Sequence, residues 1–537
     1  MNILKHWTSA SILTTLLFAT TPVGAQNNKN NQAALQKLSM AEMAITSLYV
    51  DSVDNNKLVE DAIRGMLSKL DPHSTYATAK ESKAQTESLQ GSFEGIGVQF
   101  NIVEDTLLVI QPVLGGPSEK VGILAGDRII SVNDTAIAGV KMSREDIMRR
   151  LRGPKGTKVN LGIVRRGIQD KLLFTVKRDK IPVHTLEASY MIRPGIGYIR
   201  IGSFGATTHE EFLNALDTLQ MKNEGQQLSN LILDLQDNGG GYLQAAVELA
   251  NEFLSPGDLI VYTESRSLPR QEFRVRRNGR LRNGVRVTVL INEYTASAAE
   301  IVTGALQDHD RAEVVGRRSF GKGLVQRPIE FPDGSMIRLT VSHYFTPSGR
   351  CIQKPYVKGE SKAYSEDIER RFKHGELYSA DSIHFADSLK YETLLLHRTV
   401  YGGGGIMPDV FVPLDTTQFT SFHRQLAAKG IIINTNLKYV DSHRKELQRQ
   451  YKSFEDFLSR YVVPQNLLDD IVAKAEKEKV KPRDEAELQR SLPSISLQMK
   501  ALIARDLWGM NEYFTVINES NHTVQQALQL FESPRPW

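Results

Sequence analysis

Strand-like and helix-like segments alternate through the middle of the chain, and this alternation constrains the fold more than any other feature. Branched apolar residues in IGYIRIGSF (196–204), LSNLILDLQDNGGG (228–241) and VRVTVLINEYTAS (285–297) predict strands. Apolar residues at three- and four-residue spacing in 208–222 and 298–308 predict helices between and after them. Strands that alternate with helices in this way predict an α/β layer fold.

The flanking regions have different patterns, so the 537 residues contain more than one domain. Residues 32–90 have helical periodicity, short strands and glycine turns fill 91–177, and the chain beyond 416 is mostly helical and charged. We therefore expect a multidomain α/β protein with five parts. These are a signal peptide (1–25), an N-terminal helical region (26–90), a β-rich domain (91–178), an α/β core (179–415, with a surface insertion at about 355–390) and a C-terminal helical extension (416–537).

The first residues have the pattern of a secretory signal. Lys5 and His6 precede an apolar run at 9–21, and Val-Gly-Ala at 23–25 fits a cleavage site. The run is short for a membrane span, and no later stretch could cross a bilayer. We expect an exported protein of the periplasm or cell envelope, soluble after signal cleavage; the alternative is an uncleaved anchor.

Composition excludes several classes of site. Cys351 is the only cysteine, so no internal disulfide or cysteine-based metal cluster can form, and no H-E-x-x-H motif is present. We predict neither a metal nor a cofactor. Net charge is +4, which indicates no particular partner. Eight arginines lie between Glu264 and Arg286, but Phe273 is the only aromatic residue among them, which favours a solvated hairpin over a nucleic-acid site.

The segment DLQDNGGGY (234–242) lies where a strand runs into a helix. Glycines there let backbone N–H groups approach a ligand, and the start of a helix adds a partial positive charge. An oxyanion hole needs both features. The alternative is a tight turn that requires positive φ angles.

A second segment, TASAAE (295–300), places Ser297 between small residues at the start of a predicted helix. Such a serine is open to approach, and the helix dipole favours negative charge that develops nearby. The alternative is a helix cap, the commonest role of serine at this position.

The third segment, VVGRRSFGKGLVQ (314–326), contains Lys322. Its G-x-x-x-x-G-K start matches a phosphate-binding loop, but Gly323 replaces the required Ser or Thr and a strand follows instead of a helix. On a strand, Lys322, Leu324 and Gln326 would share one face. Burial there would lower the pKa of the lysine, and a neutral amine can act as a general base. The alternative is a lysine that reaches solvent.

The β-rich region resembles a PDZ domain of the type fused to proteases. The resemblance rests on FEGIGVQF, PSEKVGILAGDRI and the GPKGT turn, in that order. PDZ domains bind an extended C-terminal peptide by strand addition, and N–H groups of a loop hold its carboxylate. By resemblance that loop is Gly95, Ile96 and Gly97. On its own, this stretch would indicate a hairpin turn.

The three chemical segments, with LDPHSTY, YFTPSGRCIQ and YGGGGIMPDVFVP in the same order, closely resemble the C-terminal processing peptidases, also called tail-specific serine proteases. The match runs from about 38 to 414 and implies a serine peptidase core of family S41 with a crotonase/ClpP-like layout. It implies a nucleophile, Ser297, and a general base, Lys322, positioned by Gln326. It further implies an oxyanion hole made by Gly239 or Gly240 with Ala298, and supporting acids at Glu300 and Asp308. Gln236 and Asp237 stand where the family often has arginine and another small residue.

The expected function is therefore an exported serine endopeptidase that captures the C-terminus of protein or peptide substrates with its PDZ domain and cleaves upstream. One alternative is a catalytically inactive PDZ adaptor of the cell envelope. Another is an acyl-thioester enzyme, which export and the PDZ domain both disfavour. No nucleic-acid partner is expected, and the sequence leaves open whether the chain forms a homo-oligomer.

Overall fold

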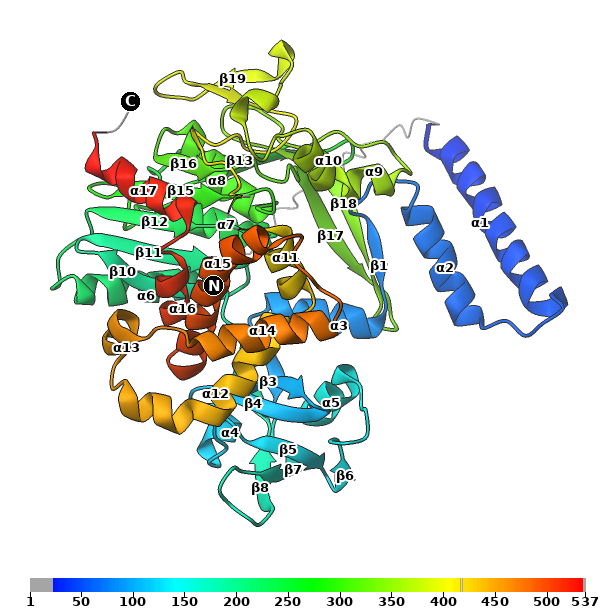
Figure 1. Cartoon of the computed structure of the whole chain (residues 1–537). Coiled ribbons are helices and arrows are strands. Elements are labelled where there is room, and N and C mark those ends of the chain that lie inside the picture. The colour runs from blue at the N-terminus through cyan, green and yellow to red at the C-terminus, as the bar shows by residue number, and fades with distance from the viewer. Residues whose placement is uncertain (1–22, 416, 418, 535–537) are drawn as a thin grey trace, which may run out of the picture. The chain divides into compact units, whose positions relative to one another are not determined.

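The computed structural model describes residues 23–415, 417 and 419–534 (Figure 1). The predicted signal peptide lies outside the described residues except for positions 23–25, which begin the first helix. The chain divides into two units, Met1–Leu70 and Asp71–Trp537. The described part of the first unit contains helices α1 (Val23–Leu48) and α2 (Asn55–Leu67), and the Asp54 side chain caps α2 by accepting a hydrogen bond from the Lys57 N–H group.

The second unit is built around a six-stranded sheet, which confirms the predicted α/β core. Its order is β10-β11-β12-β15-β16-β21, and β10 is antiparallel to β11 while the other pairs are parallel. In a parallel sheet the carboxyl ends of neighbouring strands lie together, so the turns after β12 and β15 meet at one edge. The strands are β10 (Leu186–Arg193), β11 (Ile196–Ile201), β12 (Asn230–Asp234), β15 (Arg286–Ile291), β16 (Ala312–Gly316) and β21 (Val410–Phe411).

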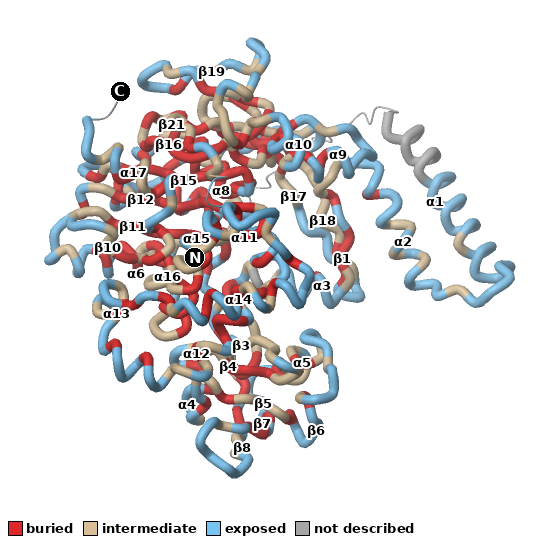
Figure 2. The backbone as a smooth tube through the Cα atoms, viewed as in Figure 1, coloured by how far each residue is buried: buried red, intermediate tan, exposed pale blue. Residues whose placement is uncertain are grey.

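Helices cover both faces of this sheet, because alternate side chains of each strand point to opposite sides. Leu231 and Leu233 belong to the core formed with α6 (Thr208–Lys222), α7 (Leu243–Ala250) and α8 (Ala298–Asp308). Ile232 faces the other way, into a cluster with α16 (Met510–Ile517) and α17 (His522–Glu532). Figures 1 and 2 show these last helices lying against the sheet and the buried chain concentrated around it. The end of the C-terminal extension is therefore part of the core.

A second sheet carries the segment that follows Lys322. It contains β1 (Thr75–Ala77), β13 (Leu259–Glu264), β14 (Gln271–Arg274), β17 (Leu324–Glu330) and β18 (Met336–Phe345), and β17 pairs only with β18. The prediction that Lys322 lies on a strand is wrong, since β17 begins two residues later. The register also shifts between Val325 and Gln326, which leaves an extra residue, Val341, on β18.

The predicted PDZ domain forms a β-rich part of the second unit and has an apolar core of its own. Its main sheet has the order β3-β4-β5-β7-β8, with β6 paired to β5, so β3 is an edge strand. A ribbon of β2 (Ser92–Gly95) and β9 (Asp179–Pro182) connects it to the core. The other elements are β3 (Val98–Val103), β4 (Thr106–Pro112), α4 (Pro117–Lys120), β5 (Arg128–Val132), β6 (Thr135–Ala136), α5 (Arg144–Leu151), β7 (Lys158–Val164) and β8 (Leu172–Lys177).

The C-terminal extension begins with five helices that share a core of their own. The second of them contacts the PDZ domain, because Asp441 accepts a hydrogen bond from the Arg128 guanidinium at 2.6 Å. The five helices are α11 (Ser421–Ala428), α12 (Ile431–Gln450), α13 (Phe454–Arg460), α14 (Gln465–Lys477) and α15 (Glu485–Leu507). No helix in the described part of the chain has the length and apolar character needed to cross a membrane.

The insertion expected at the surface is partly buried. It contains α9 (Ser361–Ser365), α10 (Asp367–Lys373) and two short 3-10 turns, and the hairpin of β19 (Lys390–Glu392) and β20 (Thr399–Tyr401) follows it. Arg371 of α10 is buried and donates to the backbone carbonyls of Ser319 and Phe320, just before Lys322. The insertion therefore supports the segment that carries the predicted base.

The arginine-rich segment forms a hairpin whose guanidinium groups pair with carboxylates. Arg270 and Arg274 pair with Glu272, and Arg280 pairs with Asp217. These pairs are exposed, as expected for a solvated hairpin.

We predict that Leu528→Ala, which removes a buried side chain between α17 and the sheet, will lower the free energy of unfolding by about 2–4 kcal/mol. Chemical denaturation followed by fluorescence measures this change, and Gln529→Ala, an exposed neighbour on the same helix, is the matched control. A loss of less than about 0.5 kcal/mol would mean that α17 does not pack on the sheet in solution.

Candidate active site

A cavity of about 530 Å³ lies where the three predicted chemical segments meet. The glycine turn contributes Gly239, Gly240 and Gly241, and the start of α8 contributes Ser297 and Ala298. The third segment contributes Lys322, Leu324 and Gln326. Residues from the end of α3 (Ala79–Leu89), from β17 and from β18 complete the wall; they include Thr86, Leu89, Gln90, Met336, Arg338 and Tyr344.

Ser297 occupies a sharp turn between β15 and α8. Its φ and ψ angles are 57° and −115°, a conformation that costs energy for any residue with a side chain. The Tyr344 hydroxyl donates to the Ser297 carbonyl oxygen at 3.1 Å. The turn thus holds the serine at the amino end of an eleven-residue helix, where the dipole favours developing negative charge.

The glycine turn packs directly against this serine. A Cβ atom on Gly240, which has a φ of 97°, would lie 2.7 Å from Ser297 Cβ and 2.8 Å from the Ala296 carbonyl oxygen. No other residue fits there. The Gly240 N–H group donates to Asn238 Oδ1 at 2.8 Å, whereas none of the hydrogen bonds found among the described residues uses the N–H groups of Gly239 or Ala298. Of the two glycines predicted as oxyanion donors, Gly239 is therefore the better candidate.

The Glu300 carboxylate connects the serine segment to the lysine segment. It is fully buried one turn into α8. It accepts the N–H groups of Ser297 at 2.8 Å and Lys322 at 2.9 Å. It also accepts the Gly321 N–H group at 2.7 Å and the Ser319 hydroxyl at 2.5 Å. Burial raises the pKa of this carboxyl above its usual value, while the hydrogen bonds oppose the rise.

Lys322 projects from the loop before β17, with its backbone fixed by Glu300. Burial lowers the pKa of its amine, and the positive charge of Arg338 lowers it further. The negative charges of Glu300 and Asp71 act in the opposite direction and are weaker. The ammonium form is therefore less stable here than in water, as a lysine base requires.

Models of known protein families match four parts of the chain. The model of peptidase family S41 matches residues 195–362, a PDZ domain model matches 108–165, and the model of the activating protease CtpB N-terminal domain matches 7–81. Residues 422–509 match a family of unknown function. The carboxy-terminal processing protease CtpA of Bacillus subtilis is 35% identical over 377 residues, which cover 68% of this chain and 79% of that protein. The chain belongs to the carboxy-terminal processing proteases. It is therefore a serine-type peptidase of family S41 with a PDZ domain.

A second relative agrees with this assignment. The carboxy-terminal-processing protease of Bartonella bacilliformis is 35% identical over 331 residues, which cover 62% of this chain and 75% of that protein. Among solved structures, the photosystem II D1 C-terminal processing protease is 26% identical and covers 69% of this chain, with a TM-score of 0.35.

Two further predicted site residues, Gln326 and Asp308, differ in where they lie relative to the cavity. Gln326 lines the cavity, and its side-chain amide donates to the Leu324 carbonyl oxygen at 3.3 Å. Asp308 is the last residue of α8, roughly 15 Å along the helix from its start. It is fully buried and pairs with the buried Arg350 guanidinium at 2.6 Å. The structure does not bring Asp308 into the cavity, and its observed contacts are those of a structural ion pair.

The predicted peptide-binding loop lies in the PDZ domain and outside the catalytic cavity. The Ile96 carbonyl oxygen accepts both the N–H group and the hydroxyl of Ser118. Gly97 has a φ of 73°, and a Cβ atom there would lie 2.9 Å from Ile181 Cδ1. The loop leads directly into the edge strand β3.

Sequence reasoning gave no role to three groups beside Lys322. Asp71 accepts the hydroxyls of Ser74 and Thr340, which fixes the loop before β1. The His73 imidazole lies 2.8 Å from the Tyr364 hydroxyl, and burial together with the charge of Lys322 lowers the pKa of His73 to about 4. The third group is the Arg338 guanidinium of β18, which lines the cavity. The LDPHSTY motif pointed to this loop, but only the fold brings it to the lysine.

We predict that Arg338→Gln will raise the pKa of Lys322, because it removes a nearby positive charge. A general base must be neutral, so the acid limb of the kcat/KM profile should move to higher pH. Arg338→Lys keeps the charge and should leave the limb near its original position. The charged or titratable groups that face Lys322 are Arg338, Glu300, Asp71 and His73, and the last three are unchanged in both variants. An unmoved limb in Arg338→Gln would exclude Arg338 as the source of the effect.

Proposed function

We propose that the protein is an exported endopeptidase in which Ser297 and Lys322 form the catalytic dyad. The observation that carries this proposal is the convergence of Ser297, Lys322 and the glycine turn on one cavity, with the Glu300 carboxylate bonded to both the serine and the lysine segments.

In the proposed mechanism, neutral Lys322 Nζ removes the proton from Ser297 Oγ as the oxygen attacks the peptide carbonyl carbon. The carbonyl oxygen becomes negatively charged and is stabilised by the N–H groups of Gly239 and Ala298. Collapse of this intermediate breaks the C–N bond, and the lysine returns its proton to the leaving amine. Neutral Lys322 Nζ then deprotonates a water molecule, which attacks the ester carbon of the acyl-enzyme. The bond from this carbon to Ser297 Oγ breaks, and Lys322 returns the proton to Ser297 Oγ.

We infer that the PDZ domain captures the free C-terminus of the substrate before cleavage. The edge position of β3 supports this proposal, because an edge strand can pair with an extended peptide. The loop of Gly95, Ile96 and Gly97 would supply N–H groups to the terminal carboxylate. Export to the periplasm or cell envelope rests on the sequence pattern of residues 1–25.

Ser297→Ala and Lys322→Ala should each reduce kcat for an unfolded protein substrate by roughly 10⁴-fold or more, since the members of a catalytic unit act together. Mass spectrometry of the products measures cleavage, and Lys222→Ala, an exposed residue of α6, is the control. A fluorophosphonate probe should label the wild-type protein at Ser297. An unlabelled wild-type protein that still binds C-terminal peptides would instead be an inactive PDZ adaptor.

Amidation of the substrate's C-terminus should weaken peptide binding about tenfold, because the loop amides lose a charged acceptor. Fluorescence anisotropy with Ser297→Ala protein measures binding without cleavage. N-terminal acetylation of the same peptide removes a charge at the other end and should have little effect. Equal affinity for the acid and the amide would exclude recognition of the carboxylate.

A further inference from the structure

Asp237, in the turn between β12 and α7, makes a reciprocal contact with Asn292. The Asp237 N–H group donates to Asn292 Oδ1 at 3.0 Å, and Asn292 Nδ2 donates to Asp237 Oδ1 at 2.7 Å. Asp237 has a φ of 63°, a conformation that aspartate and asparagine tolerate better than most residues. The two side chains therefore join the glycine turn to the segment that follows β15.

Asn292 also shapes the turn that presents Ser297. Its side-chain oxygen accepts the Tyr294 N–H group at 3.1 Å, and the backbone N–H group of Asn292 donates to Thr295 Oγ1 at 3.0 Å. The Thr295 hydroxyl donates in turn to the Leu235 carbonyl oxygen at 2.8 Å. The contact between Asp237 and Asn292 is thus continuous with the bonds that fold the nucleophile turn.

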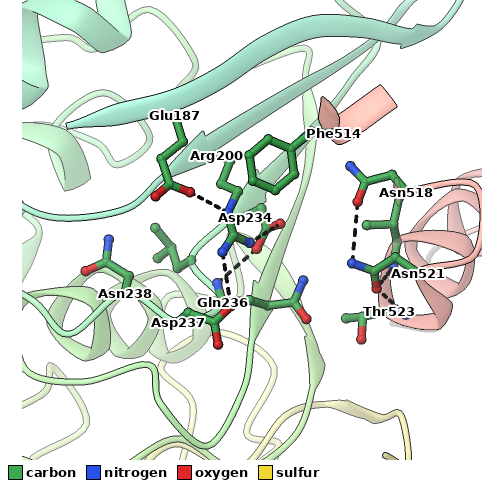
Figure 3. A network of polar contacts seen from close by, with 12 residues as sticks. Glu187, Arg200, Asp234, Gln236, Asp237, Asn238, Phe514, Asn518, Asn521 and Thr523 are labelled. Atoms are coloured by element: carbon green, nitrogen blue, oxygen red, sulfur yellow. Dashed lines mark hydrogen bonds and ion pairs between the residues drawn. The ribbon is translucent and has the colours of Figure 1, made fainter. Parts of the chain in front are cut away.

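Arg200 donates to Asp237 Oδ2, the carboxylate oxygen that does not accept from Asn292 (Figure 3). This buried residue of β11 pairs with Asp234 at 2.9 Å, with Asp237 at 3.1 Å and with Glu187 at 2.7 Å. The Phe514 ring of α16 covers the guanidinium, with its centroid 5.0 Å away. The Asp237 side chain is 59% exposed, and its carboxylate contacts a cation through one oxygen and an amide through the other.

This arrangement matters because the two proposed oxyanion donors belong to different turns. Gly239 lies two residues after Asp237, and Ala298 lies six residues after Asn292. Neither turn alone sets the distance between the two N–H groups. Catalytic geometry is sensitive at this scale, since a displacement of about 1 Å can cost about 100-fold in rate.

We propose that Asp237 is a positioning residue that, held between Arg200 and Asn292, sets the separation of the oxyanion donors beside Ser297. The proposal rests on the function proposed above for this cavity. Asp237 touches no substrate atom in this account and acts only through the turn. The helix α16 takes part because Phe514 covers the arginine that orients Asp237.

Exchange of the aspartate and the asparagine between positions 237 and 292 tests the proposal. Asn292→Asp places two carboxylates face to face, so kcat should fall about 10- to 100-fold with KM changed less than about twofold. The double variant Asp237→Asn/Asn292→Asp restores a hydrogen bond of opposite sense, and Arg200 keeps Asp234 and Glu187 as partners. It should recover at least about tenfold of the lost kcat. Asp217→Asn, an exposed carboxylate of α6 paired with Arg280, is the matched control.

A transition-state analogue separates positioning from a general loss of structure. The inhibition constant of a peptide aldehyde should weaken in proportion to the loss of kcat/KM, while affinity for the uncleaved peptide, measured on the Ser297→Ala background, stays constant. If Asn292→Asp does not fold, Asp237→Asn alone serves as the test. Its new amide NH₂ group must face another donor, such as the Arg200 guanidinium, so kcat should fall about three- to tenfold. Full kcat in the variants that fold, or no recovery in the double variant, would overturn the proposal.

Ser297→Ala, assayed in parallel, distinguishes failure of the proposed function from failure of the positioning role of Asp237. Retained cleavage by Ser297→Ala would reject the proposed function itself. Loss of cleavage by Ser297→Ala together with normal kcat in Asn292→Asp would reject only the positioning role of Asp237.

Discussion

A carboxylate without access to water is stable in a protein only when hydrogen-bond donors surround it, and Glu300 meets this requirement with donors from two segments. One donor belongs to the nucleophile turn, and three belong to the stretch that ends at Lys322. The same contacts that offset the cost of burial therefore hold the predicted nucleophile and base beside one cavity. The 24 residues between Ser297 and Lys322 include α8 and β16, and the contacts of Glu300 bring the two ends of this stretch back together.

Sequence reasoning found the chemistry of the site better than its geometry. Ser297, Lys322 and the glycine turn could be predicted because their residue types and spacing are specific, and all three line the cavity. The central place of Glu300 could not, since an acid in the first turn of a helix is also an ordinary surface charge. Lys322 was predicted on a strand by alternation with Leu324. Its N–H group bonds to Glu300 instead, so the strand begins later.

In the overall fold, too, the general pattern could be predicted from the sequence but individual contacts could not. The alternating pattern predicted the α/β core and the helical ends, because buried strands and amphipathic helices have distinct periods. Polar composition indicated a surface insertion at about 355–390, yet Arg371 from this segment is buried against the loop before Lys322. Asp308, predicted to support activity, lies outside the cavity and pairs with Arg350. Burial of charged residues in pairs depends on partners distant in sequence, and a single sequence does not reveal them.

The helices α16 and α17, which cover one face of the central sheet, follow all six strands of that sheet in the sequence. Ile232, Leu290 and Val315 on that face belong to one buried cluster with Phe514, Val524, Ala527 and Leu528 of these helices. The ribosome therefore releases all six strands before it releases α16 and α17. Until α16 and α17 have been made, the apolar face formed by Ile232, Leu290 and Val315 lacks these partners, and exposed apolar surface of this kind promotes aggregation.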